Sequence, residues 1–151
     1  MLNVYTGGTF DLFHEGHIEL LMACKRIAGS DGQVIVGLNT DEFIERFKNR
    51  APVQPYETRA NMLLACKYVD GVIPNFGEED STKTIESLDS PNKPDIIAIG
   101  SDWAGRDYYA QMGFTKEWLD KGRYVLIYID RRTGMSTTKL KEMVKNYGEL
   151  Q

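Results

Sequence analysis

Apolar runs with strand character alternate with helical patterns along most of this chain. The strand-like runs cover residues 3–5, 33–38, 68–73, 95–99 and 124–129. Apolar residues recur at helical spacing over residues 15–28, 56–67, 81–87 and 136–147. Because helices separate the strands, the pattern predicts an α/β fold in which helices cover both faces of a parallel sheet.

Composition places the chain among ordinary globular proteins and narrows its partners. With 151 residues, 42% of them hydrophobic, residues 1–151 are long enough for a single domain with its own core. The net charge of −4 argues against broad contact with nucleic acid or a membrane surface, so a phosphate ligand would need a local basic cluster.

The chain also lacks the usual signals for export or membrane insertion. No signal-peptide pattern is present, and no apolar run approaches the ~20 residues of a membrane span. Cys24 and Cys66 fall on apolar faces of predicted helices and are expected to be buried free thiols. Without disulfide or zinc spacing, these features predict a cytoplasmic protein.

The first strand leads into a segment that contains both histidines of the chain. Gly7 and Gly8 end the strand, and His14 and His17 lie on the first turn of the next helix with Gly16 between them. Unpaired backbone N–H groups and the positive end of the helix dipole make such a turn suitable for phosphate. A histidine here could simply cap the helix, but two together favour a nucleotide phosphate site.

Two further polar segments follow later strands. Residues 100–103 follow the fourth strand, and residues 130–138 join the fifth strand to the last helix. In the second of these, Arg131 could pair with phosphate while Ser136 caps the helix. A plain capped helix with a solvated arginine is the alternative. Since ligands bind beyond the carboxyl ends of parallel strands, all three segments are expected to meet in one crevice.

A basic cluster at residues 46–50 precedes a proline-containing extended loop at residues 51–55. It is either a solvated charged surface or a clamp on a triphosphate and an anionic second substrate. Arg59 and Lys67, two helical turns apart, could line the same side of the following helix. Asp70 is expected to be structural. Residues 105–122 form an apparent insertion, interpreted as a lid or a dimer contact.

These motifs together resemble one known family. Gly8-Thr9-Phe10-Asp11 with His14-x-Gly16-His17, followed by Arg131-x-x-Gly134-Met135-Ser136-Thr137-Thr138, is similar to the cytidylyltransferase family of nucleotidyltransferases. The resemblance implies a Rossmann-like three-layer sandwich of the HxGH nucleotidyltransferase type, with a five-stranded parallel sheet in the order 3-2-1-4-5. It also implies a homodimer that transfers CMP from CTP to a small phosphorylated alcohol of the glycerol-3-phosphate kind. Pyrophosphate would be released.

The resemblance further implies a role for each site residue. Catalysis would depend on His14, His17, Lys48 and Arg131. The nucleotide would be held by the two histidines and by Gly8, Thr9, Phe10, Arg50, Asp102, Trp103, Arg131, Gly134, Met135, Ser136, Thr137 and Thr138. The acceptor would contact Asp11, Lys48, Arg59 and Lys67. The protein would supply no metal ligand, and Mg²⁺ would bind mainly through the nucleotide phosphates.

Three alternatives stay open at this point. An adenylyltransferase would use ATP with a sugar phosphate, FMN or phosphopantetheine, because such enzymes share the histidine motif. A silent nucleotide-binding module is a second alternative, although the intact His14, His17, Lys48 and Arg131 argue against it. A fragment of an aminoacyl-tRNA synthetase is a third, but the chain is short and acidic for that role.

Overall fold

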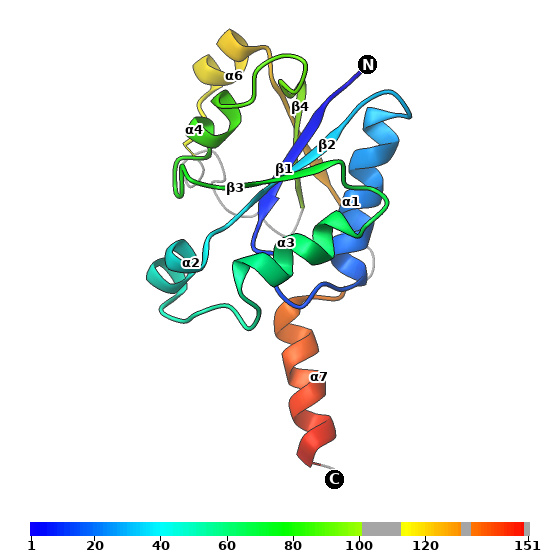
Figure 1. Cartoon of the computed structure of the whole chain (residues 1–151), viewed down its shortest axis with the longest axis vertical. Coiled ribbons are helices and arrows are strands. Elements are labelled where there is room, and N and C mark those ends of the chain that lie inside the picture. Colours follow the sequence, from blue (N-terminus) through cyan, green and yellow to red (C-terminus); the bar gives the residue numbers. More distant parts are fainter. Residues whose placement is uncertain (101–112, 131–133, 150–151) are drawn as a thin grey trace.

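The computed structural model describes residues 1–100, 113–130 and 134–149 and contains one five-stranded parallel sheet. The strands are β1 (Val4–Gly8), β2 (Val34–Leu38), β3 (Gly71–Pro74), β4 (Ile96–Gly100) and β5 (Val125–Ile129). Their order is β3-β2-β1-β4-β5, and all four neighbouring pairs are parallel (Figure 1). The predicted fold class and strand order are therefore confirmed.

Helices cover both faces of the sheet because side chains alternate along the central strands. Val4 packs into a core cluster with residues of α1 (Glu15–Ala28) and α3 (Tyr56–Leu64). The next residue, Tyr5, packs into a second cluster with residues of α4 (Ser81–Glu86) and α6 (Lys116–Gly122). The result is the expected arrangement of three layers.

Two helices differ from the prediction. Residues Asp41–Lys48 form α2, a helix that was not among the predicted elements because residues 46–50 were interpreted only as a basic cluster. Its start carries a recognisable signal, since the Thr40 hydroxyl oxygen accepts a hydrogen bond from the Phe43 N–H at 3.2 Å. Helix α3 ends at Leu64, so Lys67 lies beyond it and cannot share a helical face with Arg59.

The last helix, α7 (Thr137–Glu149), projects away from the sheet (Figure 1). Only its first turns lie against the carboxyl end of the sheet. Within the described residues, no helix has the length and apolar character needed to cross a bilayer.

Asp70 has the structural role expected of it. One carboxylate oxygen accepts hydrogen bonds from the Val34 N–H at 2.8 Å and from the Lys25 ammonium at 2.9 Å. It thereby links the start of β2 to α1 and to the segment before β3. Cys24 is buried as predicted, and this burial raises the pKa of its thiol to about 12. Cys66 is only half-buried and lies past the end of α3.

Candidate active site

A cleft of about 620 Å³ opens at the carboxyl end of the sheet. It is lined by residues at the ends of β1 and β4, residues following β2 and β3, and the start of α7. The convergence expected for the histidine segment and the start of the last helix is therefore observed. Of the segment after β4, Gly100 lines the cleft, and residues 101–103 lie outside the described residues.

The loop between β1 and α1 forms the floor of the cleft in an unusual backbone conformation. Phe10 and Leu12 have φ angles of 49° and 50°, in the left-handed region that bulky side chains seldom occupy. Phe10 is nevertheless buried, and its ring centroid lies 5.1 Å from that of His17. Packing therefore holds a strained loop next to the predicted catalytic histidine, as is common at functional sites.

The two histidines cap the helix on which they lie. The Nδ1 atom of His14 accepts a hydrogen bond from the Gly16 N–H at 3.0 Å. The Nδ1 atom of His17 accepts one from the His14 N–H at 3.2 Å. The rings stack with their centroids 3.7 Å apart. His17 lines the cleft, whereas His14 is buried behind it, so only His17 presents its ring directly to a ligand.

Gly16 lets the first turn of α1 approach the start of α7. A Cβ atom at this position would lie 2.9 Å from both His14 Cε1 and the Met135 carbonyl oxygen. A second link is the Thr137 hydroxyl, which donates a hydrogen bond to the Asp11 carbonyl oxygen at 2.9 Å. The N-terminal ends of α1 and α7, each carrying a partial positive charge, therefore face one cleft.

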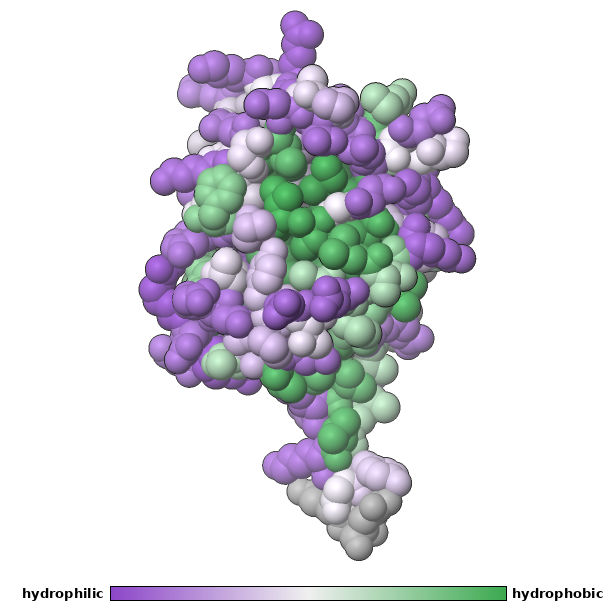
Figure 2. Space-filling model, viewed as in Figure 1, coloured by the Kyte–Doolittle hydropathy of each residue, from purple (hydrophilic) through white to green (hydrophobic). Residues whose placement is uncertain are grey.

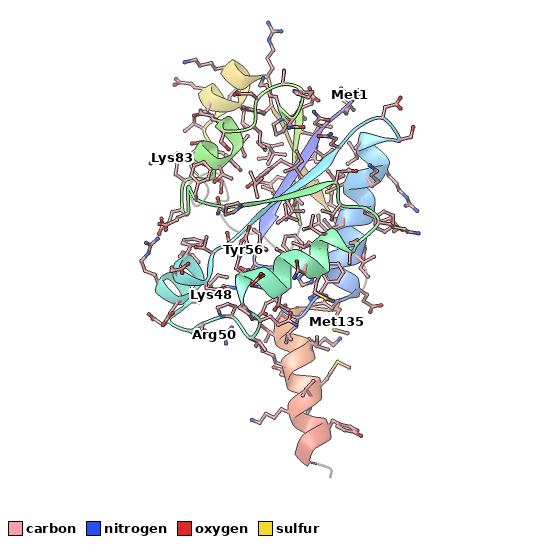
Figure 3. The ribbon with its side chains drawn as sticks, in the orientation of Figure 1. Met1, Lys48, Arg50, Tyr56, Lys83 and Met135 are labelled. Atoms are coloured by element: carbon pink, nitrogen blue, oxygen red, sulfur yellow. The ribbon has the colours of Figure 1, made fainter. Side chains whose placement is uncertain are left out.

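Among the described residues, three cationic side chains line the same cleft: Lys48, Arg50 and Lys141. Partial burial lowers the pKa of Lys48, and repulsion from Arg50 and Lys141 lowers it further, against the opposing attraction of Asp11. Figure 3 shows Lys48 and Arg50 at the end of the molecule where α7 begins. This local positive charge is the cluster that an acidic protein needs to hold phosphate.

Lys141 was not predicted from the sequence. It follows Thr137 by four residues, so both lie on one side of α7 and reach the cleft. Helical spacing from the predicted phosphate-binding segment could have found it.

Asp11 lines the cleft, but its carboxylate serves the protein backbone. Its two oxygens accept hydrogen bonds from the Val53 N–H at 2.7 Å and the Gln54 N–H at 3.0 Å. It thereby anchors the loop that follows Arg50. The structure places Asp11 at the cleft, where its carboxylate fixes the loop next to Arg50.

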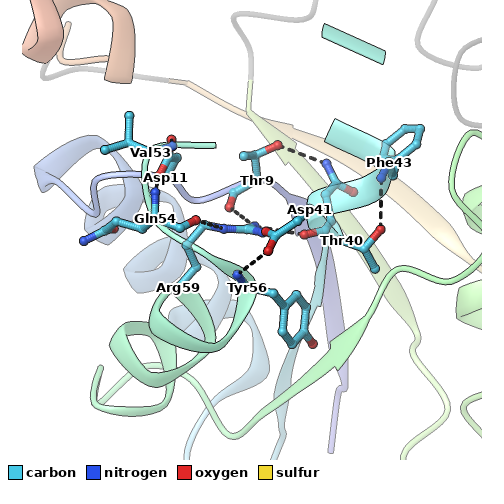
Figure 4. Close-up of polar contacts among 10 residues, drawn as sticks. Thr9, Asp11, Thr40, Asp41, Phe43, Val53, Gln54, Tyr56 and Arg59 are labelled. Atoms are coloured by element: carbon cyan, nitrogen blue, oxygen red, sulfur yellow. Dashed lines mark hydrogen bonds and ion pairs between the residues drawn. The ribbon is translucent and has the colours of Figure 1, made fainter. Parts of the chain in front are cut away.

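Arg59, by contrast, does not reach the cleft. It is fully buried, and its guanidinium donates to the carbonyl oxygens of Thr9, Asn39 and Gln54, each at 2.9 Å (Figure 4). A fourth bond, at 2.5 Å, goes to the Asp41 carboxylate. The predicted contact of Arg59 with the acceptor is therefore wrong. Its guanidinium instead holds together the loops around the site.

The predicted contact of Lys67 with the acceptor is also wrong. Beyond the end of α3, its ammonium lies 5.2 Å from the centre of the Tyr68 ring, and it is not among the described residues that line the cleft.

Away from α7, the cleft wall is polar and partly acidic. Glu78 and Glu79 both accept hydrogen bonds at 2.6 Å from Arg46 of α2. The Asn75 amide donates to the Asn39 side-chain oxygen at 2.9 Å. Asn75, Glu78 and Glu79 were not singled out from the sequence, because scattered loop residues come together only in the fold.

Most of the other predicted site residues line the cleft or lead into α7. The cleft is lined by Gly8, Thr9, Phe10, Asp11, His17, Lys48, Arg50, Ser136, Thr137 and Thr138. Gly134, with a φ angle of 68°, and Met135 lead into α7. Asp102, Trp103 and Arg131 lie outside the described residues.

Comparison with known proteins agrees with this geometry. The family model described as "Cytidylyltransferase-like" matches residues 5–143. The chain is 37% identical over 142 residues to a glycerol-3-phosphate cytidylyltransferase of Staphylococcus aureus, covering 94% of each chain. It is 35% identical to an FAD synthase of Korarchaeum cryptofilum, over 89% of this chain and 85% of the relative.

A solved structure is also similar. The lipopolysaccharide core biosynthesis protein from Thermoplasma volcanium superposes with a TM-score of 0.68 and 27% identity, over 87% of this chain and 98% of that one. Because the family model spans most of the chain and the relatives match nearly end to end, the chain belongs to the cytidylyltransferase-like family and is a nucleotidyltransferase.

Proposed function

We propose that this protein transfers CMP from CTP to the phosphate of a small phosphorylated alcohol, of the glycerol-3-phosphate kind, and releases pyrophosphate. The observation that carries the proposal is the shared cleft of His17, Lys48 and the start of α7. The glycerol-3-phosphate cytidylyltransferase of Staphylococcus aureus, similar over 94% of its own length, supports the choice of nucleotide and acceptor.

In the proposed reaction, an acceptor phosphate oxygen attacks the α-phosphorus in line, and the bond to the β-phosphate bridging oxygen breaks. The protein's contribution is to position the two anions and to neutralise charge as it develops. We assign His17 to the α-phosphoryl group, with His14 behind it, and Lys48 to the space between the two substrates. The start of α7, with Arg131, would hold the departing phosphates.

The remaining groups suit the two substrates. Thr9 and Phe10 would offer backbone contacts to the nucleotide, and Arg50 would pair with its phosphates. Asp102 and Trp103 would shape the nucleoside site. At the opposite end, carboxylate and amide oxygens such as those of Glu78 and Asn39 could accept hydrogen bonds from the hydroxyl groups of a small acceptor.

We also propose that Mg²⁺ binds mainly through the nucleotide phosphates. Among residues 1–100, 113–130 and 134–149, no cluster of three His, Cys, Asp or Glu side chains could hold a metal. Asp11 of the cleft already accepts two backbone hydrogen bonds, which suits a site where the nucleotide provides most ligands. When bound, Mg²⁺ would neutralise phosphate charge.

A second candidate uses ATP and FMN. The similarity to an FAD synthase, at 35% identity over 85% of that relative, favours it specifically. The nucleoside-binding segment would decide between the two, because phosphate contacts do not distinguish bases.

We further propose a homodimer, supported by an uncovered face of α7. Met143, Val144 and Tyr147 share one side of this helix and are 49%, 64% and 63% exposed. Figure 2 shows hydrophobic side chains along the projecting helix. An apolar helical stripe of this kind commonly packs against a partner.

The proposed specificity is tested by measuring pyrophosphate release with CTP or ATP, each with glycerol 3-phosphate or FMN. CTP with glycerol 3-phosphate should give a kcat/KM about 100-fold above any ATP combination, because a base-specific site leaves its polar groups unpaired with the wrong base. An excess of chelator should abolish turnover. Faster turnover of ATP with FMN would reject the proposal in favour of the second candidate.

Lys141→Ala should raise the KM for CTP roughly tenfold, since one charged hydrogen bond contributes about 1.5 kcal/mol. Lys145→Ala is the matched control, because Lys145 lies one turn further along the same helix and is exposed. Steady-state kinetics on both variants provides the comparison. Equal KM values for the two would show that Lys141 is only a solvated charge.

Sedimentation velocity should show a dimer that Val144→Asp converts to monomer, because the substitution places a charge on the apolar face of α7. Asn146→Asp adds the same charge on the other side of the helix and should leave the dimer intact. A monomeric wild-type protein would contradict the homodimer.

A further inference from the structure

We infer that both histidines are held as neutral imidazoles with the proton on Nε2, and that Thr137 is the positioning residue that orients His14. The proton positions follow from contacts within the ligand-free protein and do not depend on which reaction it catalyses. Its consequence for catalysis rests on the proposed nucleotidyl transfer.

The hydrogen bonds at the start of α1 determine where the protons lie. A backbone N–H can only donate, so the ring nitrogen that it meets must be unprotonated. Gly16 N–H meets Nδ1 of His14 at 3.0 Å, and His14 N–H meets Nδ1 of His17 at 3.2 Å. In a neutral imidazole whose Nδ1 is an acceptor, Nε2 carries the hydrogen. Adding a proton to Nδ1 of either ring would break the cap.

Thr137 extends this arrangement from α1 to α7. Its hydroxyl hydrogen is directed to the Asp11 carbonyl oxygen, 2.9 Å away. The lone pairs of the same oxygen are then left to face His14 Nε2 at 3.5 Å. The chain of donors therefore has one direction, from Gly16 N–H through the His14 ring and the Thr137 hydroxyl to Asp11.

Capping of α7 does not account for the orientation of Thr137. The adjacent residue, Ser136, performs that function, because its hydroxyl oxygen accepts a hydrogen bond from the Lys139 N–H at 3.0 Å. The Thr137 hydroxyl instead links the two helix ends that face the cleft.

This arrangement has a consequence for the proposed reaction. His14 stacks on His17 at 3.7 Å between centroids, so fixing the His14 ring also limits the ring that lines the cleft. The Nε2–H of His17 is then oriented as a neutral donor before substrate binds, which avoids reorganisation when charge develops on the α-phosphoryl group.

Long-range ¹H–¹⁵N NMR on the substrate-free protein at neutral pH tests the proton positions directly. The chain has only two histidines, so assignment needs one variant at each position. Both rings should show an unprotonated Nδ1 and a protonated Nε2. A protonated Nδ1 in either ring, as the other tautomer or as an imidazolium, would overturn the inference even if the enzyme is active.

Thr137→Val removes the hydroxyl and keeps the shape. We expect the His14 Nε2–H signal to shift and to exchange faster with water, while Thr137→Ser restores it. Thr138→Val is the matched control on the neighbouring cleft residue and should leave the His14 signal unchanged. A His14 signal that is the same in Thr137→Val and the wild type would overturn the role of Thr137.

Kinetics of the same variants separates this role from the proposed function. Thr137→Val should lower kcat about tenfold or more, with substantial rescue by Thr137→Ser. A perturbed His14 signal with unchanged kcat would overturn the catalytic consequence alone. A wild-type protein with the expected tautomers but no nucleotidyl transfer would refute the proposed function and leave the proton positions standing.

Discussion

The close approach of two helix N-termini is the constraint on which the site depends. Gly16 allows the first turn of α1 to lie against the segment before α7, where any side chain would collide with His14 and with Met135. Each helix end carries a partial positive charge, and bringing two such ends together is unfavourable without an anion between or near them. The geometry of the backbone thus favours a phosphate-bearing ligand before any side chain is considered.

Buried polar anchors hold the loops around this cleft. The Arg59 guanidinium fixes the segments after β1 and β2 through the carbonyl oxygens of Thr9 and Asn39, and Asp41 compensates its charge. Asp11 fixes the loop after Arg50 in the same way through two backbone N–H groups. A buried charge with all its bonds satisfied gives a definite geometry, whereas loss of one partner would be costly. These residues shape the site without presenting their charges to a ligand.

Most of the fold follows from periodicity, because parallel strands buried on both faces give apolar runs that helical patterns separate. The cleft floor was also predictable, since His17 and Thr137 occupy matching strand–loop–helix positions. What spacing could not show is burial. From the sequence, Arg59 was expected to be a cation on the exposed side of a helix, but in the structure it is fully buried. Helix α2 was missed because residues 46–50 were interpreted only as a basic cluster, although Thr40 marks the start of the helix. Glu78 and Asn75 join the cleft only through the pairing of β3 with β2.

The most direct test of the account removes the ligand-facing donor of His17 while keeping its cap. In His17→Asn, the side-chain oxygen can replace Nδ1 as acceptor for the His14 N–H, but no donor remains at the position of Nε2. We expect a free energy of unfolding within about 1 kcal/mol of the wild type, and a turnover with CTP reduced by about 100-fold or more. A stably folded variant with near-normal turnover would contradict the claim that this helix end is the site of phosphoryl transfer.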